Sequence, residues 1–278
     1  MRIVIGHDGS PGAGRAVDLV GAIDWPANSV ITLVRAIPDE GEEGAASAAR
    51  IREQAALEEV AAAVRRDGVE VDVAVADGRP SDAIDSLATQ FEADLIVVGS
   101  RGNGPIATLL VGSVAAEVTE RADRPVLVAR TREVRPIVLA TDGSASARAA
   151  EEALVAFDAF ASIPLTVVSV ADVSFRYPGR LSLSIHEVAR EADARRSADA
   201  AARRLREVGW RPRSRVRRGD PAMEILATAK SVGAGLIVIG SRGRMGATGL
   251  MLGSVSRDIL HSSETSVLVA RAAPMDGM

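Results

Sequence analysis

The sequence contains no cysteine, no long uninterrupted hydrophobic run and no excess of basic residues. The absence of cysteine excludes disulfides, thiolate nucleophiles and cysteine-ligated zinc sites, and it fits a reducing compartment. No stretch approaches the roughly 18 apolar residues of a membrane-spanning helix. The chain starts with MRIVIGHDGSPG, which enters a short apolar strand directly and lacks a signal-peptide pattern. We therefore expect a soluble cytoplasmic protein with no membrane span.

The overall charge is mildly acidic, with a formal net charge of −4 and a pI near 5.6. Nucleic-acid binding by the whole chain is therefore not expected, although a local basic patch remains open. Of the 278 residues, 47% are apolar and 25% are charged, which is ordinary for a globular protein. The length favours one or two domains.

Common catalytic and metal-binding patterns are also missing. The three histidines, His7, His186 and His261, share no metal-ligand spacing, so we expect no metal site. The glycine loops lack the lysine of the GxxxxGK[ST] phosphate-binding loop, and they do not follow the dinucleotide GxGxxG pattern.

The most informative feature present is an internal repeat. LIVVGSRG at 95–102 returns as LIVIGSRG at 236–243, a shift of 141 residues. Near the start of each copy the shift is 134, because VIGHDGS at 4–10 pairs with VLATDGS at 138–144. The second copy therefore carries seven extra residues, in or near 174–187.

A period of half the chain indicates a domain duplication rather than a solenoid of short repeats. We predict two domains, at 1–132 and 133–278, joined by the short segment RTREVRP at 130–136. Each copy alternates short apolar runs with helical patterns. In the first copy we expect five strands and four helices. The expected strands lie at 2–5, 30–37, 69–75, 94–99 and 125–130. The expected helices begin after Ser10, cover 46–66 with Gly68 as the cap, and begin at Pro80 and at Ser113. The second copy follows the same plan, with Asp220 and Pro221 at the start of a helix.

This alternation predicts an α/β fold of two tandem Rossmann-like domains, each with a parallel sheet covered by helices on both faces. Ligands in such folds bind beyond the carboxyl ends of the strands, where the strand order reverses. The turn after the first strand and the loop after the fourth strand are therefore the segments to test for a ligand site.

The loop after the fourth strand has the spacing Gly99-x2-Gly102-x9-Gly112-Ser113. Glycines without a Cβ let the backbone approach a sugar or a phosphate closely, and a helix N-terminus attracts an anion. The alternative is a glycine-rich turn followed by a capped helix. The second copy repeats the spacing at Gly240, Gly243, Gly253 and Ser254, but duplication means that it is not independent evidence. Spacing alone leaves both interpretations open.

Asp8 and Asp142 end the first strand of each copy and precede Gly-Ser. A carboxylate there can accept hydrogen bonds from a ribose or a base. Equally, aspartate often starts a turn and assists a helix cap. Arg101 and Arg242 lie inside the glycine loops, where they either neutralise phosphate charge or are simply solvated.

The order strand, DGS, GSRG-x9-GS and PVLV resembles the universal stress protein family in its tandem two-domain form, and the glycine spacing is that of its ATP-binding branch. The resemblance covers almost the whole chain. It implies a five-stranded parallel sheet of order 3-2-1-4-5 in each domain, which places strands one and four side by side. It also implies two ATP sites, and leaves open whether Mg²⁺ accompanies the ATP.

The same resemblance implies a role for each motif residue. Asp8 and Asp142 would contact the adenosine, and Gly99 and Gly240 would lie by the ribose. Backbone near Ala36 and Val170 would border the adenine. The phosphates would be wrapped by Gly102, Gly112 and Ser113 in the first copy and by Gly243, Gly253 and Ser254 in the second. The loops differ at Asn103 and Arg244, so the two affinities need not be equal.

The resulting function is that of an ATP-binding stress or regulatory protein, acting through nucleotide-dependent conformation or partner binding with little or no catalysis. One alternative is an ATP-hydrolysing or nucleotidyl-transferring enzyme on the same scaffold. Such enzymes need SGGxDS-type or HxGH-type loops, and GHDGSPG is neither. The glycine loops also offer only Arg, Ser and Thr108 near the phosphates, where a general base would be expected. The other alternative is a nucleotide-free dimerisation module, against which the intact glycines argue. By resemblance, the fifth strands of the two domains pair as a pseudo-dimer, and a homodimer of chains is open.

Two further sequence features each allow two interpretations. Arg211, Arg213, Arg215 and Arg217 alternate along one strand, which indicates a charged edge strand that blocks sheet association or a docking surface for an acidic partner. The extra segment, with FRYP at 175–178, is a lid over the second site or a longer loop.

Overall fold

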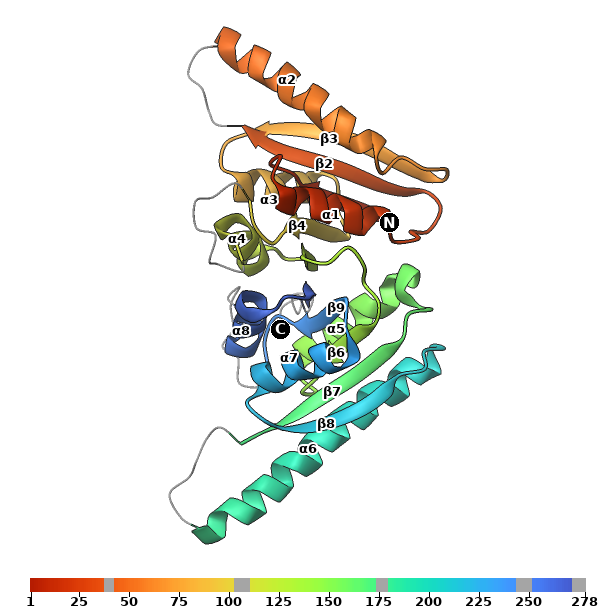
Figure 1. Cartoon of the computed structure of the whole chain (residues 1–278), viewed down its shortest axis with the longest axis vertical. Coiled ribbons are helices and arrows are strands. Elements are labelled where there is room, and N and C mark those ends of the chain that lie inside the picture. Colours follow the sequence, from red (N-terminus) through yellow and green to blue (C-terminus); the bar gives the residue numbers. More distant parts are fainter. Residues whose placement is uncertain (38–42, 103–110, 174–179, 244–251, 272–278) are drawn as a thin grey trace, which may run out of the picture. The chain divides into compact units, whose positions relative to one another are not determined.

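The computed structural model describes residues 1–37, 43–102, 111–173, 180–243 and 252–271. The chain separates into two compact units, unit 1 (Met1–Glu133) and unit 2 (Val134–Met278). Each unit is an α/β domain built around its own parallel strands (Figure 1).

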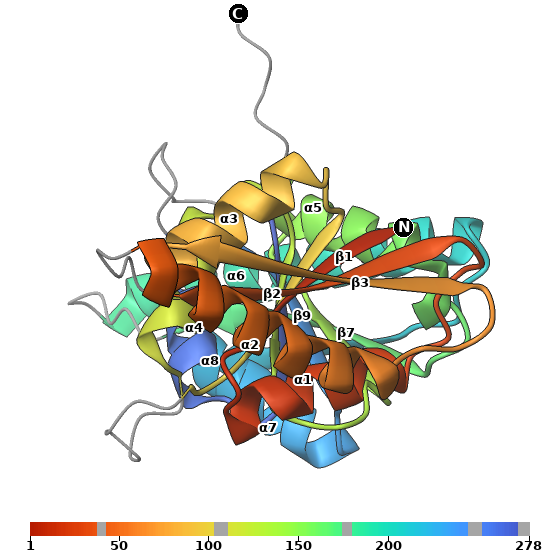
Figure 2. The same cartoon turned by 90° about the horizontal axis from the view of Figure 1, so that it is seen from above.

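Unit 1 contains five parallel strands in the order β3-β2-β1-β4-β5. These are β1 (Arg2–Gly6), β2 (Ser29–Ile37), β3 (Val69–Asp77), β4 (Leu95–Gly99) and β5 (Val126–Ala129). The helices are α1 (Pro11–Gly21), α2 (Glu43–Ala62), α3 (Pro80–Gln90) and α4 (Ser113–Arg121). Helices α1 and α2 cover one face of the strands, and α3 packs with α4 on the other, as the view from above shows for α1, α2 and α3 (Figure 2).

Unit 2 repeats this plan with the order β8-β7-β6-β9-β10. Its strands are β6 (Ile137–Ala140), β7 (Leu165–Asp172), β8 (Arg213–Gly219), β9 (Leu236–Gly240) and β10 (Ser266–Ala270). Its helices are α5 (Ala145–Ala156), α6 (Arg180–Glu207), α7 (Pro221–Val232) and α8 (Ser254–Ser262), with a 3₁₀ turn at Asp158–Phe160. The predicted fold class and the strand order 3-2-1-4-5 are therefore confirmed in both units.

The burial of the strands explains their sequences. The inner strands β4 and β9 are apolar along their length because helices cover both faces, and Leu95 and Leu236 are fully buried. The outermost strands β3 and β8 are wetter, and polar side chains alternate along them. Trp25 and Trp210 are buried packing residues.

Several helices start where the sequence predicts. The Ser10 hydroxyl oxygen accepts a hydrogen bond from the Ala13 N–H at 3.1 Å and caps α1. In unit 2 the Asp220 carboxylate caps α7 by accepting the Met223 N–H at 2.9 Å. These caps satisfy backbone donors that the first turn of a helix leaves without a partner.

The predicted end of the second helix is wrong. Helix α2 stops at Ala62 rather than continuing to residue 66, and Gly68 is not its cap. After α2 the chain forms a tighter turn, because the Ala63 N–H donates to the carbonyl of Val60, three residues earlier. The Arg66 guanidinium then donates to the Gly21 carbonyl at 3.0 Å. Gly68 instead takes a positive φ of 81° in the turn that leads into β3.

The extra residues of the second copy lengthen a helix in part. Residues 180–187 of the predicted loop region belong to α6, which has 28 residues against 20 in α2. Residues 174–179, which include the FRYP stretch, lie outside the described residues, so the choice between lid and loop stays a prediction there. No helix among the described residues is long and apolar enough to cross a bilayer.

Candidate functional site

The candidate site lies where the strand order reverses in each unit. In unit 1, β1 runs beside β4 with Gly6 opposite Val98, so both carboxyl ends meet at one edge of the sheet. In unit 2, β6 runs beside β9 with Leu139 opposite Val238. The turn after the first strand and the loop after the fourth strand of each unit are therefore neighbours. Ligands in such sheets bind at this position, beyond the carboxyl ends of the strands where the strand order reverses.

The two aspartates make the turns that sequence reasoning gave as the alternative to ligand binding. Asp8 Oδ1 accepts the Ser10 N–H at 3.0 Å, and Asp142 Oδ1 accepts the Ser144 N–H at 2.9 Å. The second carboxylate oxygen faces the glycine loop. A Cβ added at Gly102 would overlap Asp8 Oδ2, and one at Gly243 would lie 2.9 Å from Asp142 Oδ2. The aspartates thus start a turn and also border the glycine loops.

The last motif glycine completes the same cluster. A Cβ at Gly112 would lie 3.6 Å from the Gly102 nitrogen, and one at Gly253 would lie 3.6 Å from the Gly243 nitrogen. The Gly112 N–H donates to the Ser100 carbonyl at 2.6 Å, which closes the base of the loop. Each unit therefore gathers an aspartate, two loop glycines and a helix start within a small volume.

The helices that follow the loops begin without a side-chain cap. Gly112 and Gly253 are the N-cap residues of α4 and α8, and neither helix start receives a side-chain hydrogen bond. Ser113 and Ser254 are the first helical residues and are exposed. An uncapped first turn presents backbone N–H donors and the positive end of the helix dipole, which suits an anion.

The first glycine of each motif is required for packing, which the sequence did not predict. A Cβ at Gly99 would overlap the backbone of Gly12 at the start of α1, and one at Gly240 would overlap the Ser146 backbone in α5. Close packing of helix on strand therefore already requires glycine at both positions. The predicted role of Gly99 and Gly240 beside a ribose remains a prediction.

The second strand supplies a cluster that sequence reasoning missed. The Arg35 guanidinium donates through Nε to the His7 carbonyl at 3.0 Å, and it forms an ion pair with Glu53 of α2. Its Nη2 lies 3.3 Å from His7 Nδ1. Burial and, to a smaller extent, Arg35 lower the pKa of His7, while Asp8 opposes the shift. The signal that could have revealed it is a histidine directly after the first strand and an arginine near the end of the second, both present in one copy only.

Unit 2 replaces this cluster by smaller groups. Thr141, Ser169 and Ala194 stand where unit 1 has His7, Arg35 and Glu53. There the Ser197 hydroxyl of α6 donates to the Asp142 carbonyl at 3.1 Å. The two units therefore support their aspartate turns in different ways.

The remaining predicted site residues are more loosely placed. Ala36 of β2 and Val170 of β7 are half-buried on the strand next to the aspartate turn. Ser10 Oγ donates to the Arg101 carbonyl at 3.2 Å, which ties the first-strand turn to the glycine loop. The corresponding bond from Ser144 to Arg242 in unit 2 is longer, at 3.5 Å.

A second arginine stands near the unit 1 loop. Burial and the charge of Arg101 lower the pKa of Arg130, at the end of β5, to about 10. Sequence reasoning missed Arg130, although its repetition as Arg271 in PVLVAR and SVLVAR was available as a signal. Asn103, Thr108 and Arg244 lie outside the described residues.

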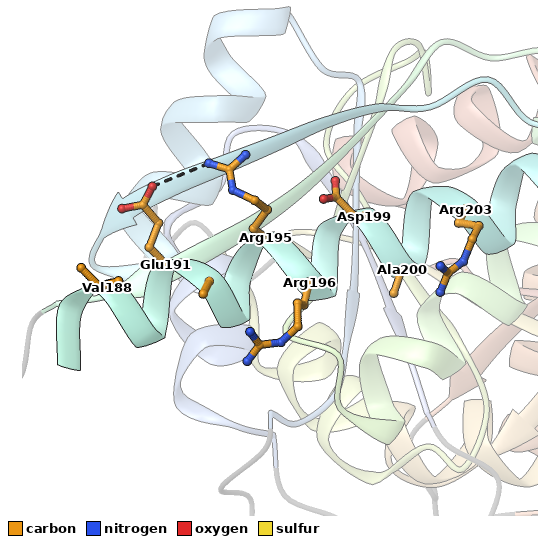
Figure 3. Close-up of a pocket in the computed structure, with 8 residues that line it drawn as sticks. Val188, Glu191, Arg195, Arg196, Asp199, Ala200 and Arg203 are labelled. Carbon is orange, nitrogen blue, oxygen red and sulfur yellow. Dashed lines mark ion pairs between the residues drawn. The ribbon is translucent and has the colours of Figure 1, made fainter. Parts of the chain in front are cut away.

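Other surfaces do not coincide with this site. A groove runs along α6, with the Arg195–Glu191 ion pair at one end (Figure 3). Its lining contains none of the predicted site residues. Among the described residues, no group of three or more His, Cys, Asp or Glu side chains could hold a metal ion.

Comparison with known proteins agrees with the repeat. The model of the universal stress protein family matches residues 1–130 and again residues 133–271. A universal stress protein of Mycobacterium tuberculosis is 35% identical over 198 residues, which cover 65% of this chain and 62% of that protein. The match thus spans less than two thirds of that relative. A second universal stress protein of the same species is 29% identical, with 98% of this chain and 95% of that protein covered.

The fold is shared with a solved structure. The crystal structure of a universal stress protein from Archaeoglobus fulgidus superposes with a TM-score of 0.72 at 22% identity, and 98% of each chain is covered.

Proposed function

This chain belongs to the universal stress protein family, and from that premise we propose that it binds ATP in each of its two domains, at 1–132 and 133–278, and acts by nucleotide-dependent regulation. The observation that carries the proposal is the cluster of Asp8, Gly102 and Gly112 and its repetition in unit 2. It joins a carboxylate acceptor, two loop glycines that lack a Cβ and an uncapped helix start. These are the groups that a ribose and a phosphate chain need.

The residues fit the chemical parts of the nucleotide. The aspartates offer carboxylate oxygens to the ribose hydroxyls, and a Cβ at Gly102 or Gly243 would crowd that oxygen. Gly112 and Ser113 in unit 1, and their counterparts Gly253 and Ser254, offer the first N–H groups of a helix to the phosphates. The backbone at Ala36 and Val170 borders the adenine in this proposal.

The arginines complete the anion-binding side of unit 1. The pKa of Arg130 is lowered mainly because the side chain is buried, and to a smaller extent by the charge of Arg101. A phosphate oxygen near both cations would stabilise their charged forms and accept two charge-assisted hydrogen bonds. Arg242 and Arg271 have the same sequence positions in unit 2. Magnesium, where present, would sit on the phosphates, because no protein metal cluster occurs among the described residues.

Regulation rather than turnover follows from the groups around the phosphates. The described parts of the loops supply arginine, serine and backbone donors, which bind and orient an anion. A hydrolytic site additionally needs a positioned general base. Nucleotide occupancy would instead fix the glycine loop against the first-strand turn, to which Ser10 already links it, and so change the surface that a partner meets.

Calorimetric titration of nucleotide-free protein with ATP tests the proposal. We expect about one ATP per unit. Gly102→Glu should remove binding by unit 1 alone, and Gly243→Glu binding by unit 2 alone, because each side chain would fill the space beside the aspartate. Unchanged stoichiometry in both variants would contradict the site assignment, and rapid multiple turnover of ATP would favour an enzyme instead.

A further inference from the structure

The outermost strands of the two units have opposite charge at equivalent positions. In the repeat, GVEVDVAVADG at 68–78 aligns without a gap with GWRPRSRVRRG at 209–219. Glu70 and Asp72 of β3 therefore correspond to Arg211, before β8, and Arg213, within it. Asp77 likewise corresponds to Arg218. Every acidic position on one edge is basic on the other.

The two units as a whole also carry opposite net charges. Unit 1 contains 13 arginines and 22 Asp and Glu residues, which gives a formal charge of 13 − 22 = −9. Unit 2 contains 20 Lys and Arg and 15 Asp and Glu residues, which gives 20 − 15 = +5. The mild overall charge of −4 thus conceals an acidic domain and a basic domain.

The edge charges are available to a partner. The side chains of Glu70, Asp72, Arg211 and Arg213 are exposed, and none of them makes a recorded ion pair within the part of the chain that the structure describes. By contrast, Arg217 and Arg218 are paired with Glu224 and Glu187. A partner of opposite charge would therefore not have to displace an existing ion pair at the four exposed positions.

Next to the basic edge, α6 carries a groove of mixed charge, in which Arg195 pairs with Glu191 and Arg196 pairs with Asp193. The groove on that helix is bordered by Arg195, Arg196 and Arg203 together with Glu191 and Asp199 (Figure 3). Ser214 of β8 donates to Asp199 at 3.2 Å, so the groove and the edge strand are adjacent. At the positions of these three arginines, unit 1 has Gln54, Ala55 and Ala62.

We propose that the acidic edge β3 of one chain docks against the basic edge β8 of a second copy of this chain, so that chains associate head to tail. Edge strands expose backbone N–H and C=O groups that can pair with another strand, and like charges on facing edges prevent that pairing. Here two β3 edges repel, as do two β8 edges, whereas an unlike pair attracts. The same charges that block the symmetric contacts therefore select the unlike contact.

Such an interface uses two different surfaces and is heterologous, so it yields closed rings or open chains rather than a single symmetric dimer. Charge complementarity also steers the encounter and weakens as salt screens it. Association should therefore rise with protein concentration and fall with ionic strength. This proposal does not depend on the nucleotide sites, because none of its residues belongs to them.

Sedimentation velocity of the full chain tests the proposal, with reversed charges on each edge. Glu70→Arg with Asp72→Arg gives a chain with two basic edges, and Arg211→Glu with Arg213→Glu gives a chain with two acidic edges. At low salt, about 50 mM, the weight-average sedimentation coefficient of the wild type should rise with concentration, and it should fall to that of one chain at about 500 mM. Each double variant alone should remain a single chain.

An equimolar mixture of the two double variants should associate again, because every contact is then between unlike edges. Circular dichroism and melting temperature check that both variants fold. A wild type that stays monomeric at all concentrations, or a mixture that stays dissociated, would overturn the proposal. Association that both variants retain would place the interface elsewhere. Nucleic acid bound by the wild type and lost with Arg211→Glu and Arg213→Glu, without self-association, would make an acidic polymer the partner instead.

Discussion

Gly102 lies against the carboxylate of Asp8 so closely that any β-carbon at this position would overlap Oδ2. The two residues are far apart in the chain, on the loop after β4 and the turn after β1. Their contact joins the two segments that a ligand at the reversal point of such a sheet must touch. The equivalent pair in unit 2 is slightly looser, since a Cβ added at Gly243 would lie 2.9 Å from Asp142 Oδ2.

The first prediction concerns this contact. Gly102→Ala should weaken ATP binding by unit 1 about tenfold or more, which corresponds to roughly 1.4 kcal/mol, because the new methyl group displaces the Asp8 carboxylate. The measurement compares the ATP affinities of two proteins that both carry Gly243→Glu, one with Gly102 and one with Gly102→Ala. In both proteins unit 1 is the remaining site.

The matched control is Gly14→Ala in α1, where a Cβ would meet nothing within 4 Å. This substitution should leave ATP affinity unchanged and stabilise the protein by roughly 0.5–1 kcal/mol, because alanine favours a helix interior over glycine. Equal loss of affinity in both variants would show that the Asp8–Gly102 contact is irrelevant to binding.

The second prediction separates the two roles of the first-strand aspartate. Asp8→Asn keeps an oxygen that can accept the Ser10 N–H and so preserves the turn. It removes the negative charge that a ribose hydroxyl would meet, so ATP affinity in unit 1 should fall roughly tenfold or more. Melting temperature without nucleotide should hardly change. A variant with wild-type affinity would leave Asp8 with the turn role alone.

The third prediction follows from the lowered pKa of His7, whose main cause is burial, followed by the charge of Arg35. Because the folded state binds the proton less readily than the unfolded state, His7 contributes stability above its ordinary pKa of 6.5 that is lost as the pH falls through its lowered value. The melting temperature should therefore decrease from pH 7 toward pH 5.

The variant His7→Thr, which copies Thr141 of unit 2, should flatten that decrease. Melting curves at matched ionic strength across this pH range provide the measurement. If the variant and the wild type lose the same number of degrees, the acid sensitivity arises from other groups.

The fourth prediction concerns a buried ion pair in unit 2. Arg204 of α6 binds the Glu151 carboxylate of α5 through two hydrogen bonds of 2.8 and 2.9 Å, and the Glu151 side chain is only 6% exposed. Arg204→Met leaves that carboxylate buried without its partner and should destabilise the protein by about 3 kcal/mol or more. Arg203→Met, on the exposed side of the same helix, should change stability by less than about 0.5 kcal/mol. Denaturant unfolding of both variants decides the point.

Much of the fold could be predicted because local patterns and global architecture agree. The apolar runs at Leu95 and Leu236, the capping residues Ser10 and Asp220 and the repeat itself indicate strands, helix starts and two domains without reference to any distant contact. The end of α2 at Ala62 was not predicted, and the segment that follows it makes a contact that no local pattern reveals, from the Arg66 guanidinium to the distant Gly21 carbonyl.

The candidate site was predictable in its motif but not in its packing. Spacing identified Gly99, yet the overlap with Gly12 that requires glycine there arises only when α1 packs on β4. Likewise Arg35, His7 and Glu53 come from a strand, the turn after β1 and a helix, and no local pattern joins them. These contacts join segments that are distant in the sequence, so a local sequence motif cannot predict them.

The central claim is that the two glycine clusters hold ATP, and the most direct test is to identify what the protein carries. Protein purified under native conditions is heat-denatured, and the released nucleotide is identified and counted. The account predicts ATP at up to about one molecule per unit, with the amount halved by Gly102→Glu. Release of no nucleotide, together with no effect of added ATP on the melting temperature, would contradict it.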